Sequence, residues 1–279
     1  MFKQPLGIDI PHSDLIINAS VIVFLIGALF FGVPDNKKTE NVLIHPVIRS
    51  AKQRVAEILL IFLTIPLTIF IGVYFFGDAK YLFISLLIML ECMLPFFAVF
   101  EKRHIKTREL VLIAVMCSMA VAVRTAFYMF PQFKPITAVI IIAGASLGAE
   151  SGFLIGSLSM LISNILFGQG PWTPWQMFGM GLIGFLSGLI FGSDLIPKNK
   201  YSFSVFGFLA APLLYGLIMN PAALILSHSE LSYKNLIAYY AAGLPLDIVH
   251  GIATAVFLFW AAVPVIKKIE RVKLKYGLV

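Results

Sequence analysis

The apolar positions of this chain fall into long unbroken runs and rarely alternate with polar positions. Runs of about 20 apolar residues predict membrane-spanning helices, because a helix satisfies its own backbone hydrogen bonds in lipid. The strands of an outer-membrane barrel would instead alternate over about 10 residues. The runs lie at 15–33, 55–76, 79–100, 110–130, 135–149, 151–167, 174–192, 204–226 and 243–266. They predict an all-α polytopic membrane protein with about nine spans, in which a tight turn near 149–151 joins the short fifth and sixth runs.

Composition excludes a water-soluble enzyme. Hydrophobic residues make up 59% of the 279 residues and charged residues only 13%, whereas soluble domains carry about 45–50% apolar and about 25% charged residues. A soluble core of this size could not bury so much apolar surface.

Basic residues between the runs predict how the chain is threaded. With the N-terminus outside, 16 of the 21 Lys and Arg residues fall in cytoplasmic segments and four in outer ones, while Arg124 lies inside a helix. Cytoplasmic connections of membrane proteins carry such an excess. We therefore expect the N-terminus outside and the C-terminus inside, in a multi-pass protein of the cell membrane.

The chain divides at a basic stretch, residues 101–108. Residues 1–107 hold three predicted spans and few glycines, whereas residues 108–279 hold six spans and most of the glycine. We expect residues 1–107 to form a three-helix membrane extension and residues 108–279 to form a six-helix unit.

Six polar side chains inside the predicted spans are candidate functional groups, because polar groups in a bilayer are costly. Counted from the predicted helix ends, all six fall within about 10 Å of the outer surface. They are Arg124, Asn164, Gln176, Asn220, Asp247 and His250. Their convergence predicts a polar cavity that opens to the outside.

Structural roles for these residues remain open alternatives. Arg124 and Asp247 would equally well neutralise each other, and His250 would more simply form a hydrogen bond to a carbonyl, or to Asp247 through a water. Asn164 and Asn220 would form hydrogen bonds that hold neighbouring helices together. Glu91, in the middle of an N-terminal span, would be protonated or paired, or would relay a proton.

The connection at 168–176 is the most distinctive stretch, with Trp172 and Trp175 beside two prolines. Tryptophans at a membrane interface usually form an aromatic belt. Because these two flank a stiff turn beside the polar residues, we favour a lid over a flat ligand. Tyr239, in the predicted outer loop or surface helix at 227–242, would contribute from the other side.

Small residues recur at four-residue spacing in three stripes, which permit close approach of neighbouring helices. One stripe joins Gly184, Gly188 and Gly192, and a second runs through 144–156. A third stripe, Ala114, Ser118 and Ala122, lies on the first helix of the six-span part and would dock a partner.

Several catalytic motifs are absent from the sequence. It has no phosphate-binding loop of the GxxxxGK[ST] type, no HExxH and no CxxC. We therefore expect no ATPase, metal or cofactor chemistry of the chain's own, and we do not expect an enzyme.

Five stretches of residues 108–279 carry a resemblance to a known family. They are 120–124, 133–138, the glycine-rich 144–156, 163–164, and 167–177 with its Pro-Trp-Thr-Pro-Trp-Gln run. Together they resemble the substrate-binding S components of energy-coupling factor (ECF) transporters. The resemblance implies a six-helix bundle that captures a vitamin-like micronutrient from outside. The three extra N-terminal helices depart from this six-span pattern.

The resemblance also implies partners and a partner-docking face. The partners would be a transmembrane T component and two cytoplasmic ATPases, which would use the ATP. Ala114, Ser118 and Ala122 match the small residues that contact the T component in the family. The S component would topple in the membrane to release its substrate inside.

The expected substrate is a vitamin, and the sequence looks most like the branch associated with cobalamin and related corrinoids. The expected substrate-binding residues are Arg124, Tyr128, Asn164, Trp172, Trp175, Gln176, Asn220, Tyr239, Asp247 and His250. The alternatives are an S component for a different vitamin, a self-contained ion-coupled transporter and, with least support, a membrane enzyme that acts on a lipid.

Overall fold

A computed structural model describes residues 107–192, 196–227, 229 and 232–277, together with Leu87 and Leu90. Within these ranges the chain is helical and has no strand, so the all-α prediction is confirmed for the described part. The three predicted N-terminal spans, Glu91 and the total of nine spans lie outside the described residues. The elements are α5 (Thr107–Ala126), α6 (Ile136–Leu147), α7 (Ala149–Phe167), α8 (Thr173–Gly192), α9 (Lys200–Ala210), the π-helical η3 (Ala211–Gly216), α10 (Leu217–Leu226) and α11 (Tyr233–Lys275).

Five helices in the described part are long and apolar enough to cross a membrane. They are α5, α7, α8, the continuous rod Lys200–Leu226 and α11. The fifth predicted span, 135–149, is instead the short helix α6. Its 12 residues extend about 18 Å, less than the roughly 30 Å of a bilayer core, and all of them are buried.

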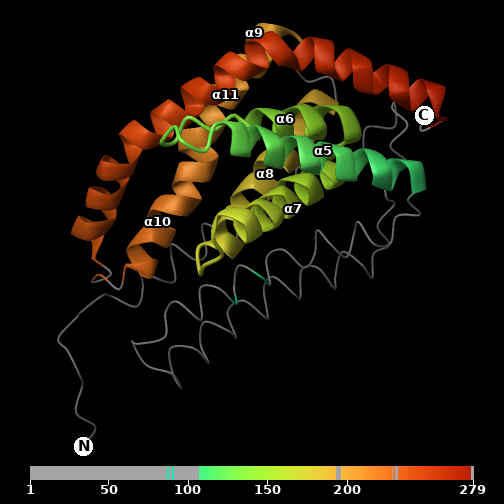
Figure 1. The fold of residues 1–279 in the computed structure, drawn as a ribbon. Helices are drawn as coiled ribbons and strands as arrows, with labels where there is room; N and C mark the ends of the chain where they lie inside the picture. The colour runs from blue at the N-terminus through green and yellow to red at the C-terminus, as the bar shows by residue number, and fades with distance from the viewer. Residues whose placement is uncertain are drawn as a thin grey trace, which may run out of the picture.

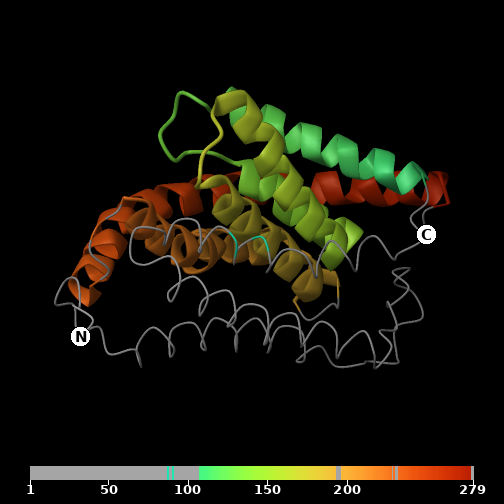
Figure 2. The ribbon, with the colours of Figure 1, turned by 90° about the horizontal axis from the view of Figure 1, so that it is seen from below.

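Helix α6 forms the centre of the bundle (Figure 1). It packs against α5, α7, α8, α9 and α11. Helix α11 arches along one side, with α9 and α10 against it, while α5 and α7 cover the other side. The start of α5 and the end of α11 lie at the same end of the bundle (Figure 2), where Arg108 Nη1 donates to the Tyr276 carbonyl at 2.8 Å. Which membrane face this end occupies stays a prediction.

Glycines allow α6, α7 and α8 to approach one another at backbone distance, as the predicted small-residue stripes indicate. A Cβ added at Gly184 would collide with the Gly152 carbonyl, and one at Gly144 or Gly152 would collide with the Gly184 carbonyl. One turn further along, Gly188 faces the backbone of Ala149. At the last glycine of the α8 stripe, Gly192, an added Cβ would meet no atom of the described residues within 4 Å.

Two predicted boundaries differ from the structure. The break between α6 and α7 falls at Gly148, whose φ of 95° suits glycine better than the residues at 149–151. Residues 227–242 were predicted as an outer loop or a short surface helix, and from residue 233 onward they are helical, but they form the start of α11 and no separate element. Ser232 caps this helix by accepting a hydrogen bond from the Asn235 backbone N–H at 3.3 Å.

The rod Lys200–Leu226 contains a wider turn in its middle. Asn199 caps its start with hydrogen bonds from the backbone N–H groups of Tyr201 and Ser202, both at 2.9 Å. Pro212 then lies in η3, which has the wider geometry of a π-helix. Proline removes a backbone donor and crowds the preceding turn, and π-segments commonly occur at functional sites. Here the segment carries Tyr215.

We predict that Gly184→Ala destabilises the bundle, because the new methyl group has no space between the α7 and α8 backbones. The expected cost is about 1–3 kcal/mol, in the range of overpacked cores. The measurement is thermal unfolding of the detergent-solubilised protein. Gly192→Ala is the matched control on the same helix, and it is expected to be neutral or slightly stabilising; equal effects of the two changes would contradict the close-packing interpretation.

Candidate functional site

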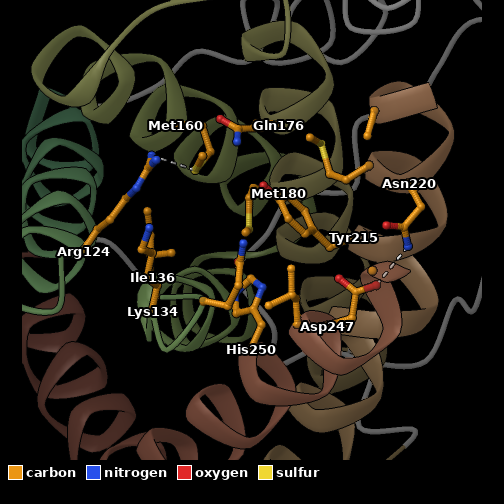
Figure 3. Close-up of a pocket in the computed structure, with 15 residues that line it drawn as sticks. Arg124, Lys134, Ile136, Met160, Gln176, Met180, Tyr215, Asn220, Asp247 and His250 are labelled. Atoms are coloured by element: carbon orange, nitrogen blue, oxygen red, sulfur yellow. Dashed lines mark hydrogen bonds between the residues drawn. The ribbon is translucent and has the colours of Figure 1, made fainter. Parts of the chain in front are cut away.

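Helices from both sides of the bundle enclose a cavity of about 250 Å³ (Figure 3). Its wall combines charged, amide and apolar side chains. The lining residues are Arg124, Gln132, Lys134, Ile136, Met160, Gln176, Met180, Tyr215, Met219, Asn220, Ala223, Gly243, Leu246, Asp247 and His250. They come from α5, the 127–135 connection, α6, α7, α8, η3, α10 and α11, so helices distant in sequence build one site.

Arg124, near the end of α5, is bound to the end of α7 through neutral groups. Its Nη1 donates to Ser163 Oγ at 2.7 Å and to Asn164 Oδ1 at 3.0 Å. The guanidinium also lies over the Phe167 ring, with Cζ 5.7 Å from the ring centroid. The guanidinium charge is therefore held in place without a carboxylate among these contacts.

Lys134 places a second cation on the same side of the cavity. Its Nζ lies 5.8 Å from the centroid of the Tyr128 ring. The Tyr128 and Phe167 rings stack, with centroids 4.5 Å apart. Burial lowers the pKa of Lys134, and the positive charge of Arg124 lowers it further. Two stacked aromatic rings thus support two neighbouring cations.

The opposite side of the cavity carries an amide–carboxylate pair. Asn220 Nδ2 on α10 donates to Asp247 Oδ2 on α11 at 3.0 Å. A Cβ at Gly216 would collide with the Asp247 carboxylate, and one at Gly243 would collide with the Asn220 amide. These two glycines leave the space that the pair occupies. Figure 3 shows Arg124 and Asp247 across the cavity from each other, so they do not form the direct pair that remained an alternative.

His250 closes the inner end of the cavity. It is buried, and its Nε2 lies 2.7 Å from Thr137 Oγ1 on α6. The Tyr215 ring packs edge-on against the His250 ring, and the two ring centroids are 5.5 Å apart. The partner of His250 Nε2 is therefore the Thr137 hydroxyl, and not the carbonyl that was one expected alternative.

Asn164 lies behind the cavity wall and joins three helices. Besides accepting from Arg124, its Nδ2 donates to Thr173 Oγ1 at 3.1 Å and to Gln176 Oε1 at 2.7 Å. Its exposed fraction is 1%. The residue acts as a connector that orients Arg124 and Gln176 toward the cavity.

Comparison with protein-family models gives one match for this chain. Residues 104–271 match the model described as the ECF-type riboflavin transporter, S component. The match covers more than half of the chain and includes every residue that lines the cavity. The chain belongs to the ECF-type riboflavin transporter S component family. No solved structure matches the chain.

As an S component, the chain is an integral membrane protein and the substrate-binding subunit of a vitamin transporter. Transporters of this type combine an S component with a T component and ATPases. The expectation of an ECF S component is therefore confirmed, and the match falls in the part of the chain that was expected to carry it.

The structure brings five of the ten expected substrate-binding residues of this S component into the cavity wall. They are Arg124, Gln176, Asn220, Asp247 and His250. Their contact with a substrate stays a prediction. Asn164 supports this set from behind the wall.

The other four expected binding residues are aromatic and lie outside the cavity wall. Trp175 belongs to the first turn of α8, which begins at Thr173, and it packs in the hydrophobic core with 8% exposure. Trp172 is exposed and folds over Gly170. Tyr128 stacks on Phe167. Tyr239 Oη donates to Ser227 Oγ at 2.7 Å and fastens the start of α11 to the end of α10. The expected tryptophan lid is thus not formed in this structure.

Sequence reasoning missed Lys134, Tyr215 and three methionines of the wall, Met160, Met180 and Met219. Lys134 follows a predicted span and was counted as an ordinary outer charge. Its position two residues after Gln132, which has a positive φ of 54°, reflects a tight turn that only the coordinates reveal. Methionine and tyrosine in apolar runs give no signal that separates a cavity wall from a core.

The predicted docking stripe of this S component is exposed on α5. Ala114, Ser118 and Ala122 are all exposed, and Ser118 Oγ donates to the Ala114 carbonyl one turn earlier at 2.8 Å. This internal hydrogen bond leaves a smooth face of small side chains. Contact with a T component at this face stays a prediction.

We predict that Asn164→Ala destabilises the protein, because it removes an acceptor from Arg124 and a donor from both Thr173 and Gln176. The expected cost is about 1–3 kcal/mol, the penalty for leaving buried polar groups without partners. Thermal unfolding in detergent measures it. Gln169→Ala, at an exposed position nearby, should change stability by less than about 0.5 kcal/mol; a similar loss for both variants would show that Asn164 is not a connector.

Proposed function

We propose that this S component captures a compact heterocyclic vitamin in the cavity between α5 and α11, and that riboflavin is the first substrate to test. The T component and the ATPases would supply the movement and the ATP. The chain itself would contribute binding, with no catalysis, metal or cofactor of its own. The observation that supports this proposal is the mixed wall of the cavity, taken together with its size.

The size of the cavity favours a small substrate. Ligand cavities usually measure about 300–1,000 Å³, and this one measures about 250 Å³. A three-ring flavin needs only modest widening of such a space. A corrinoid macrocycle with its nucleotide arm is several times larger, so the cobalamin expectation would require the helices to separate. We therefore favour the vitamin that the family description prints.

The chemistry of the wall also suits a flat heterocycle. Met160, Met180 and Met219 bring thioether groups to it, and sulfur packs favourably on aromatic rings. The Tyr215 ring adds an aromatic contact. Around these lie three amides, those of Gln132, Gln176 and Asn220, which can both donate to and accept from the carbonyl and N–H edge of such a ring.

We predict that Ala223→Phe weakens riboflavin binding by at least about tenfold. Ala223 lines the cavity through an apolar side chain, so the larger ring fills the space without removing a polar contact. Calorimetric titration of the purified protein measures the affinity. Ala241→Phe, at an exposed position of α11, is the matched control and should leave the affinity unchanged.

Trp172→Ala tests the lid in the same titration. Because the indole packs on Gly170 outside the cavity wall, we expect unchanged affinity. A loss of affinity would show that the tryptophan closes over the bound ligand. Absence of riboflavin binding by the unaltered protein would contradict riboflavin as the substrate.

A further inference from the structure

The charges that line the cavity are unbalanced. Its wall contains Arg124 and Lys134 on one side and Asp247 on the other. The Asp247 carboxylate already accepts a hydrogen bond from Asn220. Within the described residues, neither cation has a carboxylate in ion-pair contact. The side of the cavity formed by α5 and the 127–135 connection therefore carries excess positive charge.

Arg124 keeps most of its hydrogen-bonding capacity unused. A guanidinium has five N–H donors in a planar fork that fits two oxygens of one anion. In the described part of the chain, the hydrogen bonds of Arg124 all leave from Nη1, toward Met160, Ser163 and Asn164. The Nε and Nη2 donors remain for a ligand, while the Nη1 contacts hold the fork at a fixed angle.

Lys134 is held at the cavity by the tight turn that carries it. The Lys134 backbone N–H donates to the Gln132 carbonyl at 2.9 Å. The Phe133 ring packs against Phe127 and Phe257, with ring centroids 5.9 and 6.5 Å away. This anchoring of Phe133 fixes the direction of the next residue. The turn thus holds the Lys134 backbone beside the cavity, and the side chain lines the wall with its Nζ 5.8 Å from the centroid of the Tyr128 ring.

Two like charges in such a site are costly without an anion between them. Coulomb repulsion and burial both act against the pair, since the surroundings screen charges less well than water does. An oxyanion beside both groups would attract both cations. Its negative charge would offset the repulsion between them and lower the free-energy cost of burying them. Charge-assisted hydrogen bonds from Arg and Lys to carboxylate or phosphate are among the strongest in proteins.

We propose that Arg124 and Lys134 form an oxyanion site, so that the preferred substrate of this cavity is an acid with a carboxylate or phosphate group. This inference rests on the proposed function in one respect, since it assigns the substrate class of the same cavity. The ring system would lie toward Met180 and Tyr215, and the anionic group would lie toward α5. Asp247, across the cavity, would meet the donor edge of the ligand.

The test compares pairs of probes that differ mainly in charge. Riboflavin is compared with riboflavin 5′-phosphate, and nicotinamide with nicotinate, by calorimetric titration of the full purified chain. In at least one pair, we expect the anionic member to bind at least tenfold more tightly than the neutral one. The pair that shows the difference distinguishes phosphate from carboxylate.

Variants at Lys134 then locate the effect. Lys134→Gln should lower the affinity for the anionic probe at least tenfold more than the affinity for the neutral one, so that the advantage of the anion is lost. Lys134→Arg should restore that advantage. Lys267→Gln, an exposed lysine at the far end of α11, is the matched control and should leave the advantage intact. Thermal unfolding of each variant checks that it remains folded.

The outcomes separate this inference from the proposed function. If riboflavin binds but neither anionic probe gains affinity, or if the gain survives in Lys134→Gln, the oxyanion site is wrong and the proposed function stands. If an anionic probe binds through Lys134 while riboflavin does not bind, riboflavin is wrong and the oxyanion site stands. Absence of binding by all four probes contradicts both.

Discussion

The backbone contact among α6, α7 and α8 is the constraint on which the rest of the described structure depends. Apolar helices in lipid gain little from hydrophobic attraction to one another, so close van der Waals packing must hold them together. Gly144, Gly152 and Gly184 provide that closeness. The same contact sets the register of α7 against α8, and this register brings Asn164 opposite Thr173 and Gln176. The packing of these glycines thus determines which polar side chains of α7 and α8 come into contact.

Polar side chains on the membrane helices differ in how many of their donors and acceptors are already used in hydrogen bonds to one another. Asn164, behind the wall, uses both its amide donors and its carbonyl oxygen in contacts with three partners. Asn220 and Asp247, in the wall, satisfy each other in part. Among the described residues, Arg124 has neutral partners on one nitrogen only. The polar side chains nearer the cavity therefore have more donors and acceptors left for a ligand than those in the bundle interior. This is expected for a binding site whose lining residues are held in place by the residues behind them.

Much of this arrangement was predictable from the sequence, for identifiable reasons. Apolar runs gave the helices, and counting from helix ends brought Arg124, Gln176, Asn220, Asp247 and His250 to one depth. The glycine spacing gave the packing face of α8. These predictions succeed because helical geometry is regular and polar residues in lipid are rare.

The predictions that failed depend on local geometry without a periodic signal. Trp175 looked like part of a lid, but α8 begins two residues earlier and turns the indole into the core. Lys134 reaches the cavity through a turn with positive φ at Gln132, and Tyr215 through a π-helical segment. Residues 233–242 were expected in an outer loop or a short surface helix; they are helical, but they extend α11 and form no separate element. In each case the start or the shape of a turn decides where a side chain points.

The length of α11 has a mechanical consequence. Its 43 residues correspond to about 64 Å of helix, roughly twice the hydrocarbon thickness of a bilayer. A helix so mismatched to its surroundings must lean, bend or leave the bilayer at its ends, and Pro245 and Pro264 give it places to bend. Asp247 and His250 lie in the first half of α11. Near its end, Lys273 Nζ donates a hydrogen bond to the Ser146 carbonyl at 3.0 Å. The tilt of α11 therefore links the orientation of the cavity in the membrane to the position of the opposite end of the bundle.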